Sequence, residues 1–529
     1  MARKIQDPEL MCKRRWLTLI VVCLGLMVIT LDNTILNVAI PRLSYDLHAS
    51  TSSLQWIVDI YVLIFAGLLL TAGSLGDRFG RYKALSFGLV VFGIGSLASA
   101  LSGSASALIA TRGFMGIGGA FIMPATLSII TNVFTDPRER GQAIGIWAGV
   151  AALGVGIGPV AGGFLLSHFY WGSVFFVNVP IVIAALIAGW FLVPDSRDPS
   201  APKLDPLGAV LSMVGLATLL YSIIEGPAHG WTSPEIVGAF VIGIGVLGLF
   251  FVWETHYSSP MLDFHFFENP RFTVASGAIM LVFLALFGSL FLLTQYLQSV
   301  QGFTPLEAGA LVVPQATVVM IAAPLSSGRV QRYGNKRVVG VGMSVAALGT
   351  LGYVLFRIDS PVWLVIAVTM VIGLGMGNVM APATDSIMGS LPRAKAGVGS
   401  AMNDTTRQTG GAIGVAVLGS VMASRFHSLI AGAPALAHLP ASLAAQVRSG
   451  IGGAITAAQS PQAGSHAAAI ESAAKGAFMS GFHLAGVIAS AIVFCAAVAV
   501  FLWLPARETI NVPVPVPAPA ADAALAFDA

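Results

Sequence analysis

The stretch GSLGDRFGRYK, residues 73–83, places four charged residues and three glycines between two long apolar segments. A similar stretch, SGRVQRYGNKR, lies at residues 327–337, also between two apolar segments. Both have an arginine and an aromatic residue directly before a glycine, which is Gly80 in the first and Gly334 in the second. A turn that recurs about 250 residues later predicts a chain built from two related halves.

The composition indicates a membrane protein with many spans. Of the 529 residues, 56% are apolar and only 10% are charged, whereas about 25% are charged in a soluble protein. Apolar stretches of about 20 residues, long enough to cross a bilayer as helices, recur along the chain. We expect an all-α polytopic membrane protein with 14 transmembrane helices, at residues 16–40, 54–75, 83–102, 106–133, 141–167, 173–193, 206–225, 234–253, 271–298, 304–327, 336–356, 361–388, 397–424 and 478–504.

The positive charges predict the orientation of these helices. With the N-terminus in the cytoplasm, 20 of the 27 lysine and arginine residues fall in cytoplasmic segments and five in outer segments, while Arg112 and Arg407 lie inside spans. Such an excess is typical of the cytoplasmic side of membrane proteins. We expect a multi-pass protein of the cell inner (cytoplasmic) membrane with both termini in the cytoplasm.

The repeated turn and the span count together predict two pseudo-symmetric six-helix bundles plus two inserted helices. The expected organisation is a cytoplasmic N-terminal tail at 1–15, a first bundle at 16–193, a cytoplasmic linker at 194–205, two inserted transmembrane helices at 206–253, a second bundle at 271–504 that includes a long outer loop at 425–477, and a disordered cytoplasmic Pro/Ala tail at 505–529. The outer loop has room for a short helix near 439–458.

No set of residues in the sequence suggests an enzyme or a cofactor site. The three cysteines lie far apart, and no cluster of His, Cys or carboxylate residues has catalytic or metal-binding spacing. The GxGxxG pattern at 243–248 lies inside an apolar span with no strand before it, so a dinucleotide site is not expected. The chain has no GxxxxGKS or GxxxxGKT motif, which argues against ATP-driven pumping. We expect no enzyme, no cofactor, no metal site and no nucleic-acid partner.

Asp32 is a carboxylate in the middle of the apolar run ITLDNTILNVAIP, residues 29–41. It lies about 24 Å along the helix from Trp16, well inside the membrane. A carboxylate facing lipid there would be costly, so Asp32 should face the bundle interior or a water-filled cavity. Burial favours its neutral form, so it can carry a proton in one state and attract a cation in another. The alternative is a structural partner for Arg112.

Four further ionisable residues are candidates for the same kind of site: Asp59, Arg112, Asp404 and Arg407. Asp59 lies about one and a half turns into the second span from its outer side. It is either part of the functional site or a carboxylate solvated by water at the rim. Arg112, inside the fourth span, requires an interior carboxylate partner. Asp404 and Arg407 share one helix face at i and i+3, so they either neutralise each other or act on a solute.

Several stretches carry a family resemblance. GSLGDRFGRYKAL resembles the signature between the second and third helices of the major facilitator superfamily. LDNTILNVAIP, ALIATRGFMGIGGA and GVGIGPVAGG are similar to further signatures of its fourteen-helix drug:proton antiporters, the QacA-, SmvA- and EmrB-like multidrug exporters. WIVDIYVLIFAG, residues 56–67, most resembles the QacA-like members. The resemblance covers roughly residues 16–504.

The resemblance implies roles for these residues. Asp59 would attract cationic drugs, and Arg112 belongs to a signature linked with proton transfer. A cytoplasmic gating motif would latch the two halves and break during inward opening, beyond serving as a positive anchor: Gly73, Asp77, Arg78, Gly80 and Arg81. An antiporter motif would pack the halves in the outward-closed state, beyond ordinary tight packing: Gly154, Gly158, Pro159, Gly162 and Gly163. Because Gln331 replaces the acid of the first copy, the latch is expected on one side only.

We therefore expect proton-coupled efflux, by antiport and alternating access, of amphipathic, cationic drugs, driven by the proton motive force and leading to drug resistance. One alternative is a dedicated exporter of a specific metabolite, lipid or peptide. An alternative of another class is a transport-inactive membrane sensor or scaffold. The expected partners are small-molecule substrates, protons and the lipid bilayer; we expect a monomer, and envelope partners are left open.

Overall fold

The computed structural model describes residues 8–47, 51–197, 205–257, 260, 262, 264–433, 439–448 and 450–505. Within these residues, 14 helical segments are long and apolar enough to cross a membrane, and each overlaps one of the predicted spans. The predicted all-α, fourteen-helix fold is confirmed. Residues 1–7, 198–204 and 506–529, which include parts of the predicted tails and linker, lie outside the described residues.

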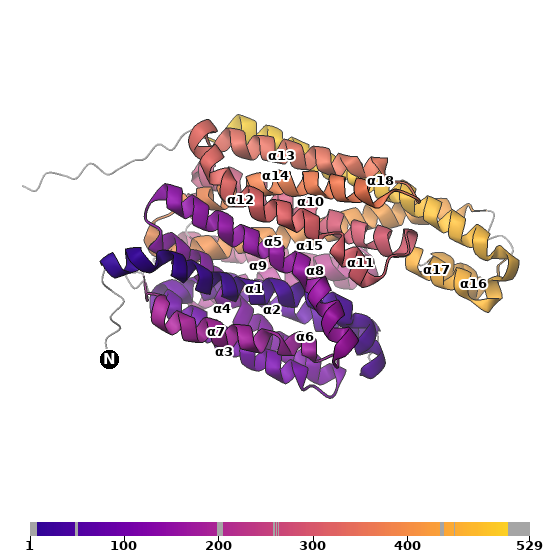
Figure 1. Cartoon of the computed structure of the whole chain (residues 1–529), viewed down its shortest axis with the longest axis horizontal. Coiled ribbons are helices and arrows are strands. Elements are labelled where there is room, and N and C mark those ends of the chain that lie inside the picture. The colour runs from indigo at the N-terminus through magenta and orange to yellow at the C-terminus, as the bar shows by residue number, and fades with distance from the viewer. Residues whose placement is uncertain are drawn as a thin grey trace, which may run out of the picture.

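The first bundle is formed by the N-terminal helices. They are α1 (Pro8–Asp46), α2 (Thr51–Phe79), α3 (Arg81–Ala100), α4 (Ala105–Val133), α5 (Pro137–His168), and the short α6 (Ser173–Phe176) followed by α7 (Asn178–Leu192). Helix α4 packs closely on both α2 and α3, and α5 packs on α1. Figure 1 shows these helices running alongside one another in the lower half of the molecule.

The second bundle repeats this arrangement. It contains α10 (Pro270–Gln295) with η3 (Tyr296–Val300), α11 (Pro305–Ala310) with α12 (Val313–Tyr333), α13 (Asn335–Leu351) with η4 (Gly352–Leu355), α14 (Val362–Gly389), α15 (Ala396–Ala431) and α18 (Ala467–Trp503), together with the short η2 (Phe264–Glu268) and η5 (Arg393–Lys395). The bundles meet where α5 packs on α12 and where α2 packs on α15. The pseudo-symmetry relates these two interfaces to each other. Helix α2 corresponds to α12 and α5 corresponds to α15, so the contact of α2 with α15 is the counterpart of the contact of α12 with α5.

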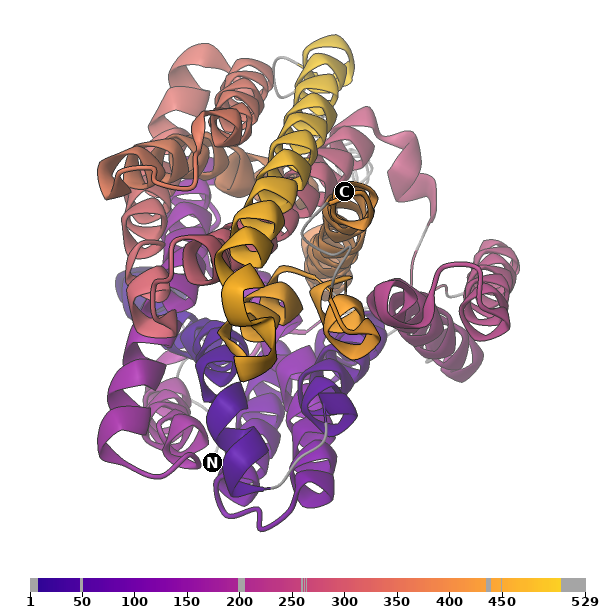
Figure 2. The same cartoon turned by 90° about the vertical axis from the view of Figure 1, so that its right-hand side faces the viewer.

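Two inserted helices lie beside the bundles. Helix α8 (Pro206–His229) packs along α9 (Pro234–His256) and also contacts α2 and α15. Figure 2 shows the pair at one edge of the molecule, away from α18. Because α8 contacts a helix of each bundle, the insert covers one of the two interfaces between them.

Local sequence signals explain where many helices begin. Five of them start at a proline that follows a capping residue, and the side chain of that residue accepts a backbone N–H from the first turn: Asp136, Asp205, Ser233, Asn269 and Thr304. Such side chains satisfy N–H groups that have no partner inside the helix, and proline fits the first turn because it has no N–H. The two turns of the repeat are set by Gly80 (φ 120°) and Gly334 (φ 82°), a conformation that glycine adopts readily.

The segment 425–477 differs from the loop predicted from its sequence. Helix α15 continues to Ala431, and α18 begins at Ala467. Between them lie α16 (Ala441–Arg448), α17 (Ile451–Gln459) and η7 (Pro461–His466), where a short helix was expected. Alanine has the highest helix propensity, and α17 packs on α18, so an alanine-rich segment folds as helix here. Helix α1 begins at Pro8, inside the predicted tail 1–15, and its span-like part runs from Arg14 to Leu36.

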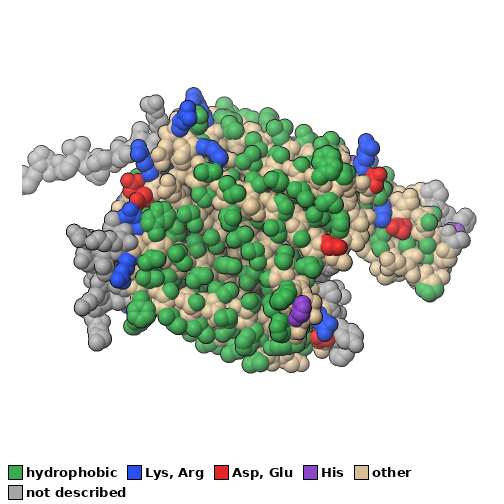
Figure 3. Space-filling model, viewed as in Figure 1, with side chains coloured by type: hydrophobic (Ala, Val, Ile, Leu, Met, Phe, Trp, Pro, Cys, Tyr) green, Lys and Arg blue, Asp and Glu red, His purple; other side chains and the backbone are tan. Residues whose placement is uncertain are grey.

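The two ends of the molecule differ in charge. In Figure 3, apolar side chains cover the middle of the visible face, while charged side chains gather toward its ends. We call the end that carries the two repeated turns the basic end, since Arg78, Arg138, Arg332, Arg337 and Arg393 lie there. The opposite end carries α16 and α17.

Close contact between α3 and α4 depends on two glycines. A Cβ atom at Gly118 would lie 2.6 Å from the backbone N of Phe92, and one at Gly88 would lie 2.7 Å from the carbonyl oxygen of Gly118. Real side chains do not approach so closely, so these helices touch through their backbones. Gly245 on α9 has open space around it instead.

We predict that Gly118→Leu lowers the midpoint of thermal unfolding of the purified protein, whereas Gly245→Leu leaves it within error. The first substitution forces α3 and α4 apart, and overpacking of this kind costs about 1–3 kcal/mol. Tryptophan fluorescence during heating in detergent measures the midpoint. Equal midpoints for both variants would show that the α3–α4 contact is not tight.

Candidate functional site

Asp32 of α1 and Arg112 of α4 form an ion pair inside the first bundle. An oxygen of Asp32 lies 2.5 Å from a guanidinium nitrogen of Arg112, and both side chains are almost completely buried. The Nε of Arg112 also donates to the backbone carbonyl of Ile57 on α2, at 3.1 Å. The Tyr61 ring lies under the guanidinium, 4.4 Å from its carbon, in cation–π geometry. The predicted interior partner of Arg112 is therefore Asp32.

Sequence reasoning missed the rest of this network. The amide of Asn178 on α7 donates to the second oxygen of Asp32 and to the hydroxyl of Ser96 on α3, both at 3.1 Å. Ser96 in turn donates to the carbonyl of Phe175 at 2.8 Å. Five helices and α6 thus meet around one carboxylate. The only signal in the sequence was a lone asparagine at the start of an apolar span, which is weak by itself.

Asp59 lies apart from this pair. Ile57 and Tyr61 face Arg112, and Asp59, two residues from each, lies on a different face of α2. That face meets α8, since the neighbouring Trp56 stacks on Tyr221 with ring centroids 6.3 Å apart. Asp59 is half-buried and close enough to Glu225 of α8 for the two carboxylates to repel each other. The structure therefore places Asp59 beside the inserted helices.

Asp404 and Arg407 lie on α15 at the interface between the bundles. Their closest nitrogen–oxygen distance is 3.4 Å, which is a looser pair than that of Asp32. Asp404 is buried, and its second carboxylate oxygen has no hydrogen-bond partner. The guanidinium carbon of Arg407 lies 4.6 Å from the ring centroid of Phe283 on α10 and 5.3 Å from that of Trp147 on α5. A delocalised cation thus lies between an aromatic ring of each bundle.

The predicted gating motif joins the two bundles at the basic end. The Asp77 carboxylate, buried at the end of α2, accepts the backbone N–H groups of Gly397 and Val398 at 2.8–3.1 Å. It thereby caps the N-terminus of α15, where a negative charge is favourable. Arg81 pairs with Asp77 at 2.8 Å and also donates to the carbonyl of Arg393 at 2.7 Å.

The glycines of this motif allow α2 to come close to α15. A Cβ atom at Gly73 would lie 2.6 Å from the carbonyl oxygen of Gly397, so α2 and α15 touch through their backbones. Gly80 forms the turn, and a Cβ there would meet the carboxylate of Asp195. Arg78 lies with its guanidinium carbon 5.6 Å from the Phe79 ring.

The second copy of the turn makes a different contact. Ser327 corresponds to Gly73, and its hydroxyl donates to the carbonyl of Arg138 at the start of α5, at 3.3 Å. The cross-bundle ion pair on this side joins Arg140 of α5 to Asp385 of α14 at 2.7 Å. Gln331 is exposed and does not replace Asp77. Sequence reasoning did not pair Arg140 with Asp385, because nothing local connects positions 245 residues apart.

The predicted antiporter motif divides between two neighbours. Gly154 and Gly158 pack against the hydroxyl-bearing side chains of Thr30 and Thr34 on α1, inside the first bundle, and Gly162 continues this face. Toward the second bundle, Gly163 packs on Leu306 and Pro159 on Gly309, both in α11. Further glycines that were not predicted complete that interface: Gly145 against Pro324, Gly149 against Met320 and Gly156 against Ala316.

The structure thus brings together two of the predicted pairs, Asp32 with Arg112 and Asp404 with Arg407, and it also pairs Asp77 with Arg81 inside the predicted gating motif. It does not bring Asp59 to any of these arginines. In the described part of the chain, no group of three or more His, Cys, Asp or Glu side chains is arranged to hold a metal ion.

Comparison with known proteins agrees with this architecture. The sequence model of the Major Facilitator Superfamily matches residues 22–415. The chain is 37% identical over 487 residues to the multidrug efflux pump LfrA of Mycolicibacterium smegmatis, covering 92% of this chain and 96% of that one. It is 34% identical to the tetracenomycin C resistance and export protein of Streptomyces glaucescens (92% and 91% covered) and 35% identical to the methyl viologen resistance protein SmvA of Salmonella typhimurium (82% and 86% covered).

Solved structures show the same fold. The human organic anion transporter MFSD10 superposes with a TM-score of 0.58 at 14% identity, covering 92% of this chain and 99% of that one. The two bundles, their shared interfaces and the matched sequence lead to one conclusion: this chain is a multi-pass membrane protein that belongs to the major facilitator superfamily, a family of transporters and not of enzymes.

Proposed function

We propose that this protein is a proton-coupled exporter of amphipathic, cationic drugs in the cell inner membrane. The observation that carries the proposal is the completely buried pair of Asp32 and Arg112, in a chain whose relatives include multidrug efflux pumps. A stable fold does not need a charge pair inside an apolar bundle, and intramembrane ionisable residues commonly serve proton or ion pathways. The basic end faces the cytoplasm in this proposal, because positively charged segments are retained there.

Asp32 is suited to carry the proton. In the present conformation it has no exposed surface, so neither a proton nor a drug reaches it from solution. Protonation in another conformation would neutralise the carboxylate and leave Arg112 without its counter-charge. The guanidinium would then change its contacts with α2, which also forms the gate at the basic end. This series of changes links the charge of Asp32 to the conformation of the bundle.

The substrate is expected nearer to Asp404. Arg407 lies between Phe283 and Trp147, and this aromatic pair can equally accept a flat cationic ring from a drug. The free oxygen of Asp404 supplies the negative charge for it. A drug cation would displace Arg407, whose pairing is loose. Because the two rings belong to different bundles, the shape of this binding site depends on the position of one bundle relative to the other.

Export would then proceed in three steps. From the cytoplasm-open state, a drug cation enters between the bundles and binds near Asp404. The bundles close at the basic end through Asp77, Arg81, Arg140 and Asp385, and the site opens outward. A proton from outside binds Asp32, the drug leaves, and the proton is lost to the cytoplasm after the reverse movement.

We predict that Asp32→Asn abolishes transport of ethidium driven by an imposed pH gradient in proteoliposomes of known protein orientation. The amide cannot gain or lose a proton, so the cycle stops. Asp46→Asn is the matched control, because Asp46 is an exposed carboxylate at the end of the same helix and, among the described residues, pairs with Arg42. Equal transport by the wild type and Asp32→Asn would assign Asp32 a structural role. Absence of wild-type transport would instead favour a dedicated exporter of another solute.

A double variant separates coupling from folding. Asp32→Asn alone leaves Arg112 buried without a counter-charge, which is destabilising. We expect Asp32→Asn/Arg112→Gln to recover much of the lost unfolding temperature without recovering gradient-driven transport. Recovery of both properties would mean that the pair serves stability alone.

We predict that the gate depends on the Arg140–Asp385 pair. Arg140→Asp and Asp385→Arg should each reduce ethidium transport by about tenfold or more, because removing a charged hydrogen-bond partner costs about 1.5–3 kcal/mol. The exchange variant Arg140→Asp/Asp385→Arg restores opposite charges and should recover a substantial part of the rate. If the exchange variant is no better than either single variant, the pair does not hold the gate.

A further inference from the structure

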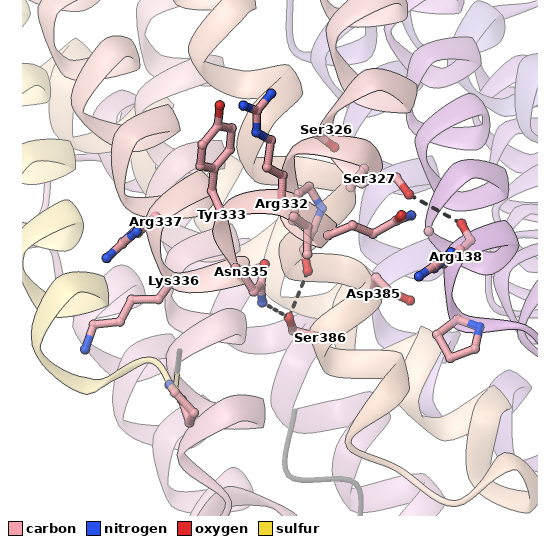
Figure 4. A pocket seen from close by; sticks show the side chains of 18 of the residues that line it. Arg138, Ser326, Ser327, Arg332, Tyr333, Asn335, Lys336, Arg337, Asp385 and Ser386 are labelled. Atoms are coloured by element: carbon pink, nitrogen blue, oxygen red, sulfur yellow. Dashed lines mark hydrogen bonds between the residues drawn. The ribbon is translucent and has the colours of Figure 1, made fainter. Parts of the chain in front are cut away.

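A cavity of about 920 Å³ opens at the basic end, beside the second repeated turn. Five cationic side chains line it: Arg138, Arg271, Arg332, Lys336 and Arg337. Figure 4 shows Arg332, Lys336 and Arg337 along one side, where α12 turns into α13, and Arg138 on the other side, at the start of α5. The cavity is therefore bounded by both bundles.

The acidic residues of the cavity are already engaged. Asp136 accepts the backbone N–H groups of Arg138 and Glu139 as the cap of α5. Asp385 pairs with Arg140, which does not line the cavity. Among the residues that the structure describes, no carboxylate pairs with Arg332, Lys336 or Arg337. The cavity thus has a net positive charge, which is unfavourable for a cationic drug and favourable for an anion.

The backbone adds to this preference. Helix α13 begins at Asn335 inside the cavity, and no side chain caps its N-terminus. The first N–H groups of a helix carry a partial positive charge and bind phosphate readily. Asn335 itself is held by a hydrogen bond to Ser386 of α14, which fixes this helix end in place.

The rim of the cavity beside the end of α18 is apolar. Phe501, near the end of α18, lines it and is 39% exposed, and the adjacent Leu502 and Trp503 are more than 60% exposed. Exposed apolar side chains next to a basic cavity match a molecule with a phosphate group at one end and hydrocarbon at the other. Basic pockets at the cytoplasmic side of membrane helices bind anionic lipid headgroups in this way.

We propose that this cavity binds the phosphate-bearing headgroup of an anionic phospholipid from the cytoplasmic leaflet. The location in that leaflet rests on the orientation proposed above, but binding itself does not depend on transport. Arg138 belongs to the first bundle, whereas Arg332 and Arg337 belong to the second. A bound headgroup therefore bridges the bundles beside the Arg140–Asp385 pair and favours the conformation that is closed at the basic end.

The test uses the full-length protein in a neutral detergent. Its thermal unfolding midpoint is followed by tryptophan fluorescence while dihexanoyl phosphatidylglycerol, dihexanoyl phosphatidylcholine or inorganic phosphate is added. The variant is Arg332→Gln/Arg337→Gln, which removes two exposed charges from the cavity. The matched control is Lys83→Gln/Arg197→Gln, which removes two exposed charges outside the cavity, one from the start of α3 and one from the linker that follows α7.

We expect phosphatidylglycerol to raise the midpoint of the wild type and the control in a saturable way, and phosphatidylcholine to have little effect. In the Arg332→Gln/Arg337→Gln variant, the apparent affinity should fall by about tenfold or more, since charged hydrogen bonds are lost. Arg138→Gln should weaken binding as well, because the ligand contacts both bundles. Arg138→Gln changes a single side chain, so binding can still be tested with it if the double variant folds poorly.

Three results would overturn the proposal. The first is no shift with phosphatidylglycerol. The second is an equal loss of affinity in the control, which would indicate general charge attraction. The third is an equal effect of inorganic phosphate at the same concentration, which would assign the cavity to a free phosphate and not to a lipid. None of these results bears on ethidium transport, so failure here is distinguishable from failure of the proposed export.

Discussion

A charge within the apolar length of a membrane helix must find its partner inside the protein, and in the first bundle that requirement is met around Asp32. Arg112 and Asn178 satisfy its two carboxylate oxygens, and Tyr61 lies against the guanidinium. Four helices are positioned by these contacts alone. Because every partner sits on a different helix, a change in the charge of one carboxylate alters the packing of the whole bundle.

The interior of the second bundle is packed with aromatic side chains. Its interior near the opposite end is an aromatic cluster in which Phe482 stacks with Tyr296, Tyr353 and Phe356 at centroid distances of 5.0–5.9 Å. Its ionisable pair, Asp404 with Arg407, lies at the interface with the first bundle and is loosely paired. Asp32 and Arg112 are thus sealed inside the first bundle, whereas Asp404 and Arg407 lie where the two bundles meet. The pseudo-symmetric fold therefore carries an asymmetric distribution of charge.

The sequence predicts the helices well because apolar length and charge are local properties. The spans, the turns at Gly80 and Gly334 and the need of Arg112 for a carboxylate all follow from single segments. The partners of Asp32 other than Arg112 do not, because a serine or asparagine in a span is common and its neighbour on another helix is not encoded nearby. The pairing of Arg140 with Asp385 and the two-sided packing of the α5 glycines likewise depend on how the bundles meet. In the outer segment, helices lie where one short helix was expected near 439–458, and α15 and α18 extend into it, because alanine favours helix.

Helix α15 connects features that lie far apart. It runs for 36 residues, about 54 Å, without an internal proline, whereas α4, α5, α12 and α14 each contain one. Asp77 caps its first turn, Asp404 and Arg407 lie along it, and its last turns lead toward α16 and α17. Because Asp77 caps one end of α15 and α16 and α17 follow its other end, the contacts at the two ends of the molecule are joined through one helix.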